Sequence, residues 1–439
     1  MEENRGRDDK SIRRICKMKK KISYLVNHPL ISGSSIIFLG LFSSYFVHYL
    51  FNLAMGRLLK PAEYGLVTSL VSVTILFAVF QASLTGIFAK FSAKFNALKD
   101  QGALLGLFNQ GFKFTFIFSM IIVGILLIFF KPFMDFLHIS DFRMVALTYF
   151  YIFLSIVASV PNGLLQGEIR VYLFSFLNIF GALLKILLGI VFVLIGLKAY
   201  GAMFAIVVSA FIPYVLSIII IRKGIKKNAA GDSKVDASFI KELKGYSLKF
   251  FLATLGITVF TSIDTIFARH FFSPVLAGQY AALSLMGKSI FYFTSPIHFV
   301  LFPLVAQKKE KKEKVAEILV LGASLVALTS VAASFFYFLF PGLVLAIFFP
   351  NPEYKMLIPY LGPFSLFIIV FSLAYLLNNY LLSLGKTEVF KINIFCALLL
   401  TILFFFYHSS FFQVIGVLFG SAFLLLVLLL LYYWYNGRD

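Results

Sequence analysis

Charged side chains are scarce in this chain. Of its 439 residues, 13% are charged and 60% are hydrophobic, and 56 of them are Phe. A soluble domain carries about 25% charged residues and is about 45–50% apolar. The composition therefore excludes an ordinary soluble protein. The longest polar connection, residues 222–246, is also too short to form a hydrophobic core of its own.

The common motifs of enzymatic chemistry are missing as well. The sequence has no phosphate-cradling Gly-x-x-x-x-Gly-Lys-Ser/Thr loop, no His-Glu-x-x-His metal pair, no His-x-x-x-Asp acyltransferase spacing and no Asp-x-Asp pattern. Its two cysteines, Cys16 and Cys396, give neither a disulfide framework nor a zinc-ligand spacing. We therefore expect a protein that is not an enzyme and holds no metal or cofactor. The chain has no nucleotide-binding loop, so any process that it drives would take its energy from a Na⁺ or H⁺ gradient, or from consumption of the product on the far side of a membrane.

Long apolar runs take the place of these features. Each is long enough to cross a hydrocarbon core of about 30 Å as a helix, and the alternation typical of a membrane β-barrel is absent. The sequence thus predicts an all-α polytopic membrane protein with about twelve transmembrane helices. The expected spans are residues 30–55, 66–89, 105–130, 142–165, 172–196, 200–221, 247–268, 275–303, 316–340, 356–382, 389–407 and 411–435.

Positive charge is distributed unevenly over the connections between these spans. When alternate loops are assigned to opposite sides, 29 Lys and Arg residues fall on one side and seven on the other. Positively charged loops stay cytoplasmic, so we expect a multi-pass protein of the cytoplasmic membrane with both termini inside. The basic segment 1–29 is expected to lie at the membrane interface, where anionic lipid headgroups attract it. Orientation and lipid explain the net charge of +20 without nucleic acid.

One sequence pattern occurs twice in the chain. An Arg near the end of one span is followed by Pro and then by Gly four residues later, once in each half of the chain. The duplication predicts a bundle over 30–221, a cytoplasmic connector over 222–246, a second bundle over 247–435 and a tail over 436–439. Six helices per half place both halves in the same orientation, and paired halves around a midplane site are a common transporter plan. The two copies of the pattern are Arg57, Pro61 and Gly65, and Arg269, Pro274 and Gly278.

The first copy, Arg57-Leu58-Leu59-Lys60-Pro61-Ala62-Glu63-Tyr64-Gly65, resembles the R-x-L-x-P-x-E-(F/Y)-G signature of Wzx-type polysaccharide-export flippases. These lipid-linked oligosaccharide translocases belong to the superfamily of multidrug/oligosaccharidyl-lipid/polysaccharide exporters. One departure is Gln279, where many members have an aliphatic residue. Further matching pieces follow in the family's order: 162–167, 263–266, 278–280, 296–303 and 382–386.

The resemblance implies a V-shaped pair of six-helix bundles that works by alternating access. It also implies a flippase that moves an anionic polyprenyl-diphosphate-linked oligosaccharide across the cytoplasmic membrane, for lipopolysaccharide, capsule or exopolysaccharide. The expected partners are this lipid-linked sugar, the bilayer and other proteins of polysaccharide assembly. An ion-coupled multidrug exporter of the same superfamily is the first alternative. A polytopic polysaccharide polymerase or ligase is a second, but it requires a long external loop that this chain lacks.

Three lysines inside apolar runs are the strongest candidates for the substrate site: Lys185, Lys288 and Lys113. A charge at bilayer depth costs roughly 2.5–3.5 kcal/mol, so such a side chain is expected to face a cavity and to suit an anion. Lys185 lies about 20 Å from either end of its span, too deep to reach the interface. The alternative for Lys185 and Lys288 is a structural tie to Asp264 or to backbone carbonyls. For Lys113, nearer the end of a span, it is snorkelling.

Other charged residues are weighed in the same way. Arg57 and Arg269 are candidates for gripping phosphate, although a cation at a helix C-terminus is also favoured by the helix dipole. Asp264 is a candidate for ion coupling, and a structural pair with a lysine is its alternative. Glu168 and Arg170 form a candidate gate pair, or are simply solvated loop charges. A histidine among apolar residues, such as His48, is more often a packing residue.

Overall fold

The computed structural model describes residues 29–167, 171–226, 246–310 and 315–436. Within these ranges every regular element is helical. Glu168, Arg170 and most of the connector 222–246 fall outside them, as do the basic segment up to residue 28 and residues 437–439. The expectation of an all-α polytopic fold is confirmed.

The first half of the chain forms one group of helices. Proline at the first turn starts α3, where its missing N–H costs nothing, and the Asp100 carboxylate accepts a hydrogen bond from the Ala103 N–H at 2.8 Å to cap α4. Gly196, with φ of 95°, reverses the chain between α8 and α9. The elements are α2 (Pro29–Leu58), α3 (Pro61–Ala97), α4 (Gln101–Ile128), α5 (Phe130–Phe136), α6 (Phe142–Val157), α7 (Ser159–Gly167), α8 (Val171–Phe192), η1 (Val193–Leu197) and α9 (Lys198–Lys226).

The second half repeats this order of long and short helices. Its first two long helices, like those of the first half, are separated by a tight turn that ends in proline. A short helix again follows the third long one. The elements are α11 (Tyr246–Phe271), α12 (Pro274–Glu310), α13 (Ala316–Leu339), α14 (Pro341–Phe348), η2 (Pro352–Leu357), α15 (Ile358–Ser383), η3 (Thr387–Val389), α16 (Phe390–Phe406) and α17 (Phe411–Asn436).

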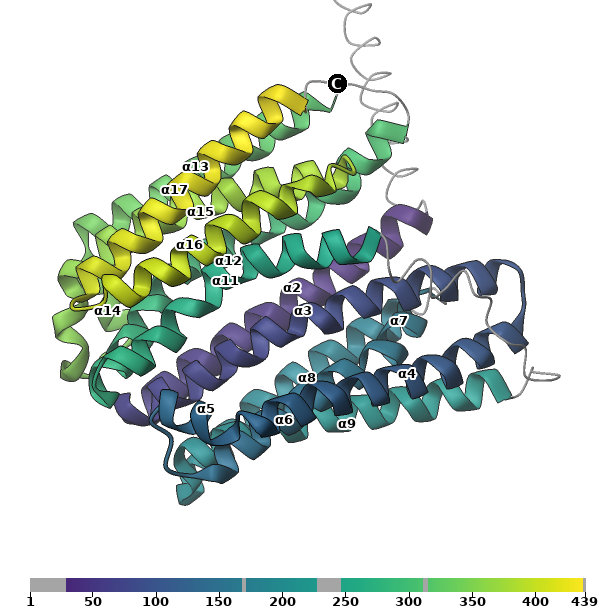
Figure 1. Ribbon diagram of the computed structural model, residues 1–439, viewed down its shortest axis with the longest axis horizontal. Helices are drawn as coiled ribbons and strands as arrows, with labels where there is room; N and C mark the ends of the chain where they lie inside the picture. The colour runs from purple at the N-terminus through teal and green to yellow at the C-terminus, as the bar shows by residue number, and fades with distance from the viewer. Residues whose placement is uncertain (1–28, 168–170, 227–245, 311–314, 437–439) are drawn as a thin grey trace, which may run out of the picture.

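The long helices account for the expected number of spans. Nine stretches of the described residues are long and apolar enough to cross a membrane, and one of these, Tyr172–Lys223, contains both α8 and α9. Helices α2 and α12, of 30 and 37 residues, lie among them in the same two groups (Figure 1). About twelve transmembrane helices therefore form two six-helix bundles, with α6 and α7 together making one span.

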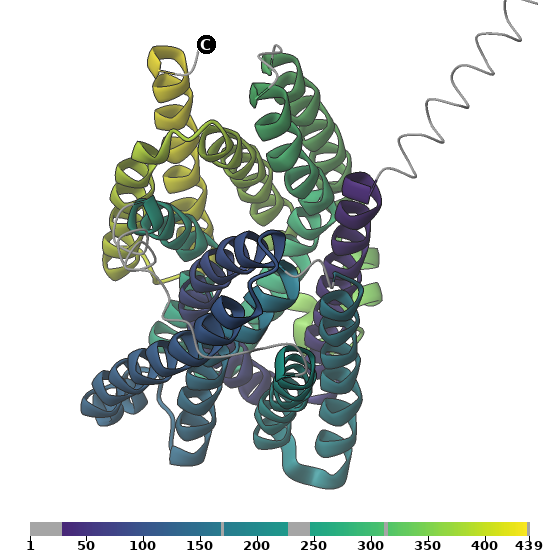
Figure 2. The same ribbon diagram turned by 90° about the vertical axis from the view of Figure 1, so that its right-hand side faces the viewer.

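The two bundles lie side by side, with the first half coloured purple to teal and the second green to yellow (Figures 1 and 2). They meet where α3 packs against α11 and α12. Their backbones approach closely at the repeated turns: a Cβ added to Gly278 would lie 1.7 Å from the Pro61 carbonyl oxygen. A Cβ on Gly65 would likewise lie 2.7 Å from the Gly278 nitrogen. The two copies of the sequence pattern therefore touch each other, and only glycine permits that distance.

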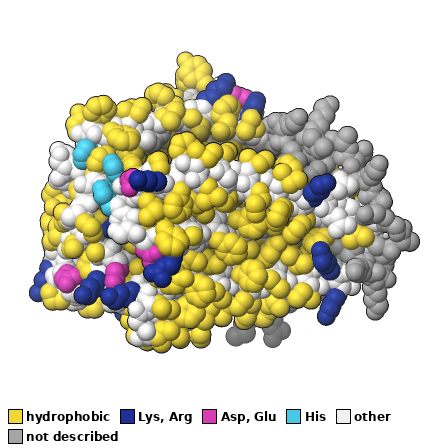
Figure 3. Space-filling model, turned by 60° about the horizontal axis from the view of Figure 1, so that its bottom comes forward, with side chains coloured by type: hydrophobic (Ala, Val, Ile, Leu, Met, Phe, Trp, Pro, Cys, Tyr) yellow, Lys and Arg dark blue, Asp and Glu magenta, His cyan; other side chains and the backbone are white. Residues whose placement is uncertain are grey.

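The outside of the molecule suits a bilayer. In one face, charged side chains gather mainly toward two opposite ends, with a hydrophobic band between them (Figure 3). Exposed aromatic and aliphatic side chains such as Phe395 and Ile402 on α16 contribute to the apolar surface. Large exposed apolar areas of this kind mark contact with a membrane or a partner. The protein is a multi-pass membrane protein.

Candidate functional site

A cavity of about 600 Å³ lies mainly inside the first bundle and is closed on one side by the second. Helices α2, α3, α6, α7, α8 and α9 line it from the first bundle, and α11, α12 and α15 from the second. On α3 its lining begins at Val71, ten residues after Pro61. At 1.5 Å per residue this is about 15 Å from the repeated turns. The cavity is therefore separated from the end of the molecule where the two glycines touch.

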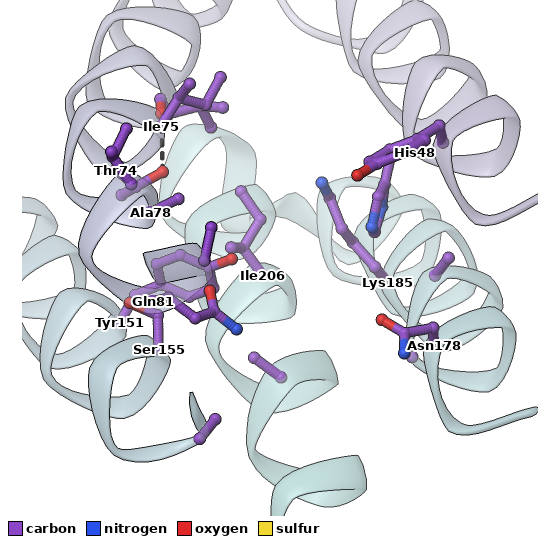
Figure 4. A pocket seen from close by; sticks show the side chains of 18 of the residues that line it. His48, Thr74, Ile75, Ala78, Gln81, Tyr151, Ser155, Asn178, Lys185 and Ile206 are labelled. Atoms are coloured by element: carbon purple, nitrogen blue, oxygen red, sulfur yellow. Dashed lines mark hydrogen bonds between the residues drawn. The ribbon is translucent and has the colours of Figure 1, made fainter. Parts of the chain in front are cut away.

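Lys185 of α8 faces this cavity, as expected from the sequence. Its ammonium group lies 4.3 Å from the centre of the Phe51 ring, a cation–π contact. In the described part of the chain, no carboxylate forms an ion pair with it, and none lines the cavity. His48 of α2 lies beside Lys185 (Figure 4) and also lines the cavity. The site thus carries an uncompensated positive charge.

The wall opposite Lys185 is polar but neutral. Gln81 of α3, Tyr151 of α6 and Asn162 of α7 line it, and Figure 4 shows Gln81 and Tyr151 across the cavity from Lys185. Sequence reasoning did not single out these residues as a site. The available signal was their type, since amide side chains such as Gln81 are expensive inside apolar helices unless they face water or a partner.

Lys288 and Asp264, in contrast, are bound to each other inside the second bundle. The Lys288 Nζ lies 2.9 Å from both Asp264 carboxylate oxygens and donates a further hydrogen bond to the Thr261 carbonyl at 2.8 Å. Ser284 and Tyr280 also donate to the Asp264 Oδ2, at 2.9 and 3.3 Å. Asp264 is fully buried, Lys288 is 7% exposed, and neither lines the cavity. The structural alternative therefore describes this pair.

A stripe on α12 explains the pairing. Tyr280, Ser284 and Lys288 are spaced four residues apart and so share one helix face. Side chains on a helix lean toward its N-terminus, so the long Lys288 side chain reaches back along this face to Asp264. The spacing is readable in the sequence and was the signal for the pair. Because the two charges neutralise each other and their hydrogen bonds are satisfied by protein groups, this buried ion pair does not need to face a water-filled cavity.

Arg57 and Arg269 lie outside the cavity and bind backbone in the opposite bundle. Arg269 of α11 donates from Nε to the Leu137 carbonyl at 3.0 Å and from Nη2 to the His138 carbonyl at 3.2 Å, just after α5. Arg57 of α2 donates from Nε to the Phe348 carbonyl at 2.9 Å and from Nη2 to the Ile347 carbonyl, in the last turn of α14. We call these two contacts the arginine clasp.

The clasp is reciprocal. Each arginine ends the first helix of its own bundle and caps the short helix of the other, where a cation is favoured by the helix dipole. Arg269 is 6% exposed, whereas Arg57 is exposed. For both arginines the structure thus favours the alternative to gripping phosphate, which is a cation at a helix C-terminus. The helix that each one caps belongs to the other bundle. The clasp joins the bundles at the end where Gly65 and Gly278 touch.

Lys113 lies on the outer face of α4. Its side chain is exposed, beside the exposed Phe114 and Phe116, and it does not line the cavity. A lysine on a membrane-facing surface can extend its ammonium group toward the interface while its stem stays apolar. The snorkelling alternative therefore fits Lys113, and the structure does not bring it together with Lys185 or Lys288.

The matching interior of the second bundle is filled by aromatic side chains. Phe260 of α11 stacks on Phe371 of α15 at 5.8 Å between ring centres, and Phe371 lies 5.4 Å from Phe291 of α12. Phe364 and Phe367 are also fully buried there. Packed rings leave little room for water, so the cavity lies mainly on the side of the first bundle, and Phe291 forms part of the wall that the second bundle contributes.

Solved structures with a similar fold are transporters. A structure described as "Inward-facing conformation of a multidrug resistance MATE family transporter of the MOP superfamily" matches with a TM-score of 0.67 and 16% identity, covering 88% of this chain and 93% of that one. A MOP superfamily transporter from Pyrococcus furiosus, whose description reports reverse polarity of its binding pocket, matches with a TM-score of 0.59 and 14% identity, covering 94% and 96%. No curated protein sequence matches the chain.

The matching family model and the fold together identify the class of this molecule as a membrane transporter of the MOP superfamily, the multidrug/oligosaccharidyl-lipid/polysaccharide exporters. A family model described as polysaccharide biosynthesis protein matches residues 30–309. The chain belongs to that family. The family and the fold are those of transporters, in agreement with the expectation that the protein is not an enzyme.

Proposed function

We propose that this transporter moves an anionic, polyprenyl-diphosphate-linked saccharide from the inner to the outer leaflet of the cytoplasmic membrane, by alternating access. The observation that carries the proposal is Lys185, a cation in the cavity with no carboxylate beside it among the described residues. A diphosphate headgroup cannot enter hydrocarbon unaided, because an unpaired charge there is very costly. Lys185 offers it a partner, while the lipid tail remains in the bilayer.

Membership in the polysaccharide biosynthesis protein family supports this substrate class. The rival is a multidrug exporter, as the descriptions of several similar structures say of those proteins. A pump for cationic drugs needs acidic groups in its cavity, and the described residues lining this one include none. The charge of the site therefore favours an anion.

The arginine clasp supports a mechanism in which one end of the transporter is shut while the other is accessible. Arg57 and Arg269 hold the bundles together at the turns, and the cavity lies on the far side of that contact. The basic residues Lys90, Lys94 and Lys99 lie at the opposite end of α3 from Pro61, so the positive-inside rule places the clasp outside. In our proposal the clasp opens when the loaded cavity turns outward, and both termini are cytoplasmic.

The decisive experiment is leaflet transfer in liposomes with a labelled polyprenyl-diphosphate saccharide. Lys185→Met should reduce transfer by at least tenfold, because it removes the only cationic lysine in the described cavity lining while keeping its apolar bulk. Lys113→Met, on the outer face of α4, is the matched control and should keep wild-type transfer. Equal transfer by wild type and Lys185→Met would refute the assignment. Export of a cationic dye without lipid transfer would favour the multidrug alternative.

Coupling to Na⁺ or H⁺ is a further part of the proposal. In the structure Asp264 already accepts hydrogen bonds from Lys288, Ser284 and Tyr280, so coupling through it requires this pair to open during the cycle. Transfer measured with and without imposed Na⁺ and H⁺ gradients separates ion coupling from transfer driven by consumption of the product. Other polysaccharide assembly proteins are the proposed partners on the product side.

A further inference from the structure

We infer that the cavity has two separate subsites: a diphosphate site at Lys185 and, on the opposite wall, a subsite for neutral sugar rings formed by Gln81, Tyr151 and Asn162. The inference rests on the proposed function and goes beyond it, because it assigns the part of the headgroup that carries no charge. It follows from where polar groups lie in the cavity and from which of them are left without a partner.

The position of the three residues separates them from the cation. They belong to α3, α6 and α7, whereas Lys185 and His48 belong to α8 and α2. Figure 4 shows Gln81 and Tyr151 together on one wall and Lys185 with His48 on the other. A headgroup that places its phosphates at Lys185 and extends across the cavity therefore meets neutral groups.

Hydrogen bonding singles out these three from the other polar residues on the same wall. The Thr74 hydroxyl donates to the Val71 carbonyl at 2.7 Å, and the Ser155 hydroxyl donates to the Ile152 carbonyl at 2.8 Å, each within its own helix. The side chains of Gln81, Tyr151 and Asn162 make no hydrogen bond within the described residues. Among the polar residues that α3, α6 and α7 contribute to the described cavity lining, these three remain free for a ligand.

Their chemistry fits a sugar better than a phosphate or a drug. Each amide offers both a carbonyl acceptor and an NH₂ donor, and the phenol offers both in one group. A sugar ring presents a row of hydroxyls that donate and accept alternately, together with an apolar C–H face that can lie on the Tyr151 ring. A phosphate needs donors only, and the described lining on this side supplies no cation. A few convergent polar groups in an otherwise apolar cavity are what fixes the orientation of a ligand.

The test compares binding of two lipids to the full-length protein in nanodiscs: undecaprenyl diphosphate, and the same lipid carrying N-acetylglucosamine or galactose. We expect the wild type to bind at least one sugar-bearing lipid about tenfold more tightly than the bare diphosphate, since two or three additional hydrogen bonds contribute roughly that factor. The double variant Gln81→Ala with Asn162→Ala should lose this preference and keep wild-type affinity for bare undecaprenyl diphosphate. The retained affinity also shows that the variant is folded.

Two controls make the assignment specific. Lys185→Met should weaken both lipids by the same factor and so preserve the sugar preference. Thr74→Val, which removes a hydroxyl already bonded within its helix, should change neither affinity. The inference is overturned if the wild type binds bare and sugar-bearing lipids equally, or if the double variant weakens both alike. If the wild type binds no polyprenyl diphosphate at all, it is the proposed function that fails.

Discussion

The two bundles start from the same sequence pattern and treat their interiors in opposite ways. Asn52 and Asp264 each lie five residues before the arginine of the pattern, and Ile75 and Lys288 each lie fourteen residues after its proline. In the first bundle, Asn52 and Ile75 line the cavity. In the second bundle, Asp264 and Lys288 form an ion pair, and neither residue lines the cavity. Corresponding positions thus serve an open site in one half and a closed core in the other.

This difference shows what decides whether a membrane-buried lysine is available for a ligand. Lys288 has a carboxylate and a carbonyl within 2.9 Å, and both members of the pair are buried. Among the described residues, the partner of the Lys185 ammonium group is the face of the Phe51 ring. A cation without a carboxylate is tolerated at this depth when it faces water. The partner of each lysine, rather than its position along the helix, determines its role.

The largest effect is expected from breaking the ion pair of the second bundle. Asp264→Ala should destabilise the protein by about 3–5 kcal/mol, because it leaves the buried Lys288 without a counter-charge. The double variant Asp264→Asn with Lys288→Met should regain most of this loss. Lys185→Met, in the first bundle, should change stability by less than about 0.5 kcal/mol. Unfolding midpoints in detergent measure all three, and a Lys185→Met variant as unstable as Asp264→Ala would erase the contrast.

A somewhat smaller effect is expected where the halves touch. Gly278→Ala places a Cβ 1.7 Å from the Pro61 oxygen, so the turns must separate, at a cost of about 1–3 kcal/mol or more. Gly416→Ala on α17 is the matched control, because a Cβ there meets nothing within 4 Å. Thermal unfolding and leaflet transfer should both fall for Gly278→Ala alone. If the two variants behave alike, the turns do not touch in the membrane.

The two arginines of the clasp should contribute unequally to stability. Arg269→Ala removes two hydrogen bonds from a buried guanidinium, and Arg57→Ala removes two from an exposed one. A hydrogen bond to a charged group contributes about 1.5–3 kcal/mol when buried and less when water competes. Arg269→Ala should therefore lower the unfolding midpoint more than Arg57→Ala. Arg269→Lys should lower the unfolding midpoint less than Arg269→Ala but should not reach the wild-type value, since lysine lacks the planar fork. A wild-type midpoint for Arg269→Lys would argue against the paired geometry.

The smallest effect concerns a surface contact of the second bundle. The ammonium groups of Lys249 and Lys391 lie 2.5 Å and 2.8 Å from the Glu388 carboxylate. Their hydrogen bonds, of which that from Lys249 has the larger effect, lower the pKa of Glu388 to about 2. A lowered pKa in the folded state means that the stabilisation is present above the ordinary pKa of 4.5 and is lost as the pH falls toward 2. Glu388→Gln should therefore match the wild type at low pH and be slightly less stable at pH 7, as pH-dependent unfolding would show. A deficit that persisted at low pH would point to another cause.

Much of the fold could be predicted because it depends on local patterns. Apolar runs fix the helices, and the turn from Arg57 to Gly65 with its copy from Arg269 to Gly278 indicates the duplication. The site was harder. Lys185 was expected in a cavity and lies there, whereas Lys288 met the same criterion of depth and is paired instead. Depth in a span says that a charge needs a partner, but it does not identify that partner.

By itself, the sequence determined that this chain spans a membrane many times, that its halves repeat and that its deep lysines require compensation. Each of these follows from the type and spacing of residues along one helix. Only the tertiary structure decided that Phe51 lies beside Lys185 and Asp264 beside Lys288, and that each arginine caps a helix of the other half. Burial, pairing and access to water depend on which helix faces come together, and that is a property of the packed bundles.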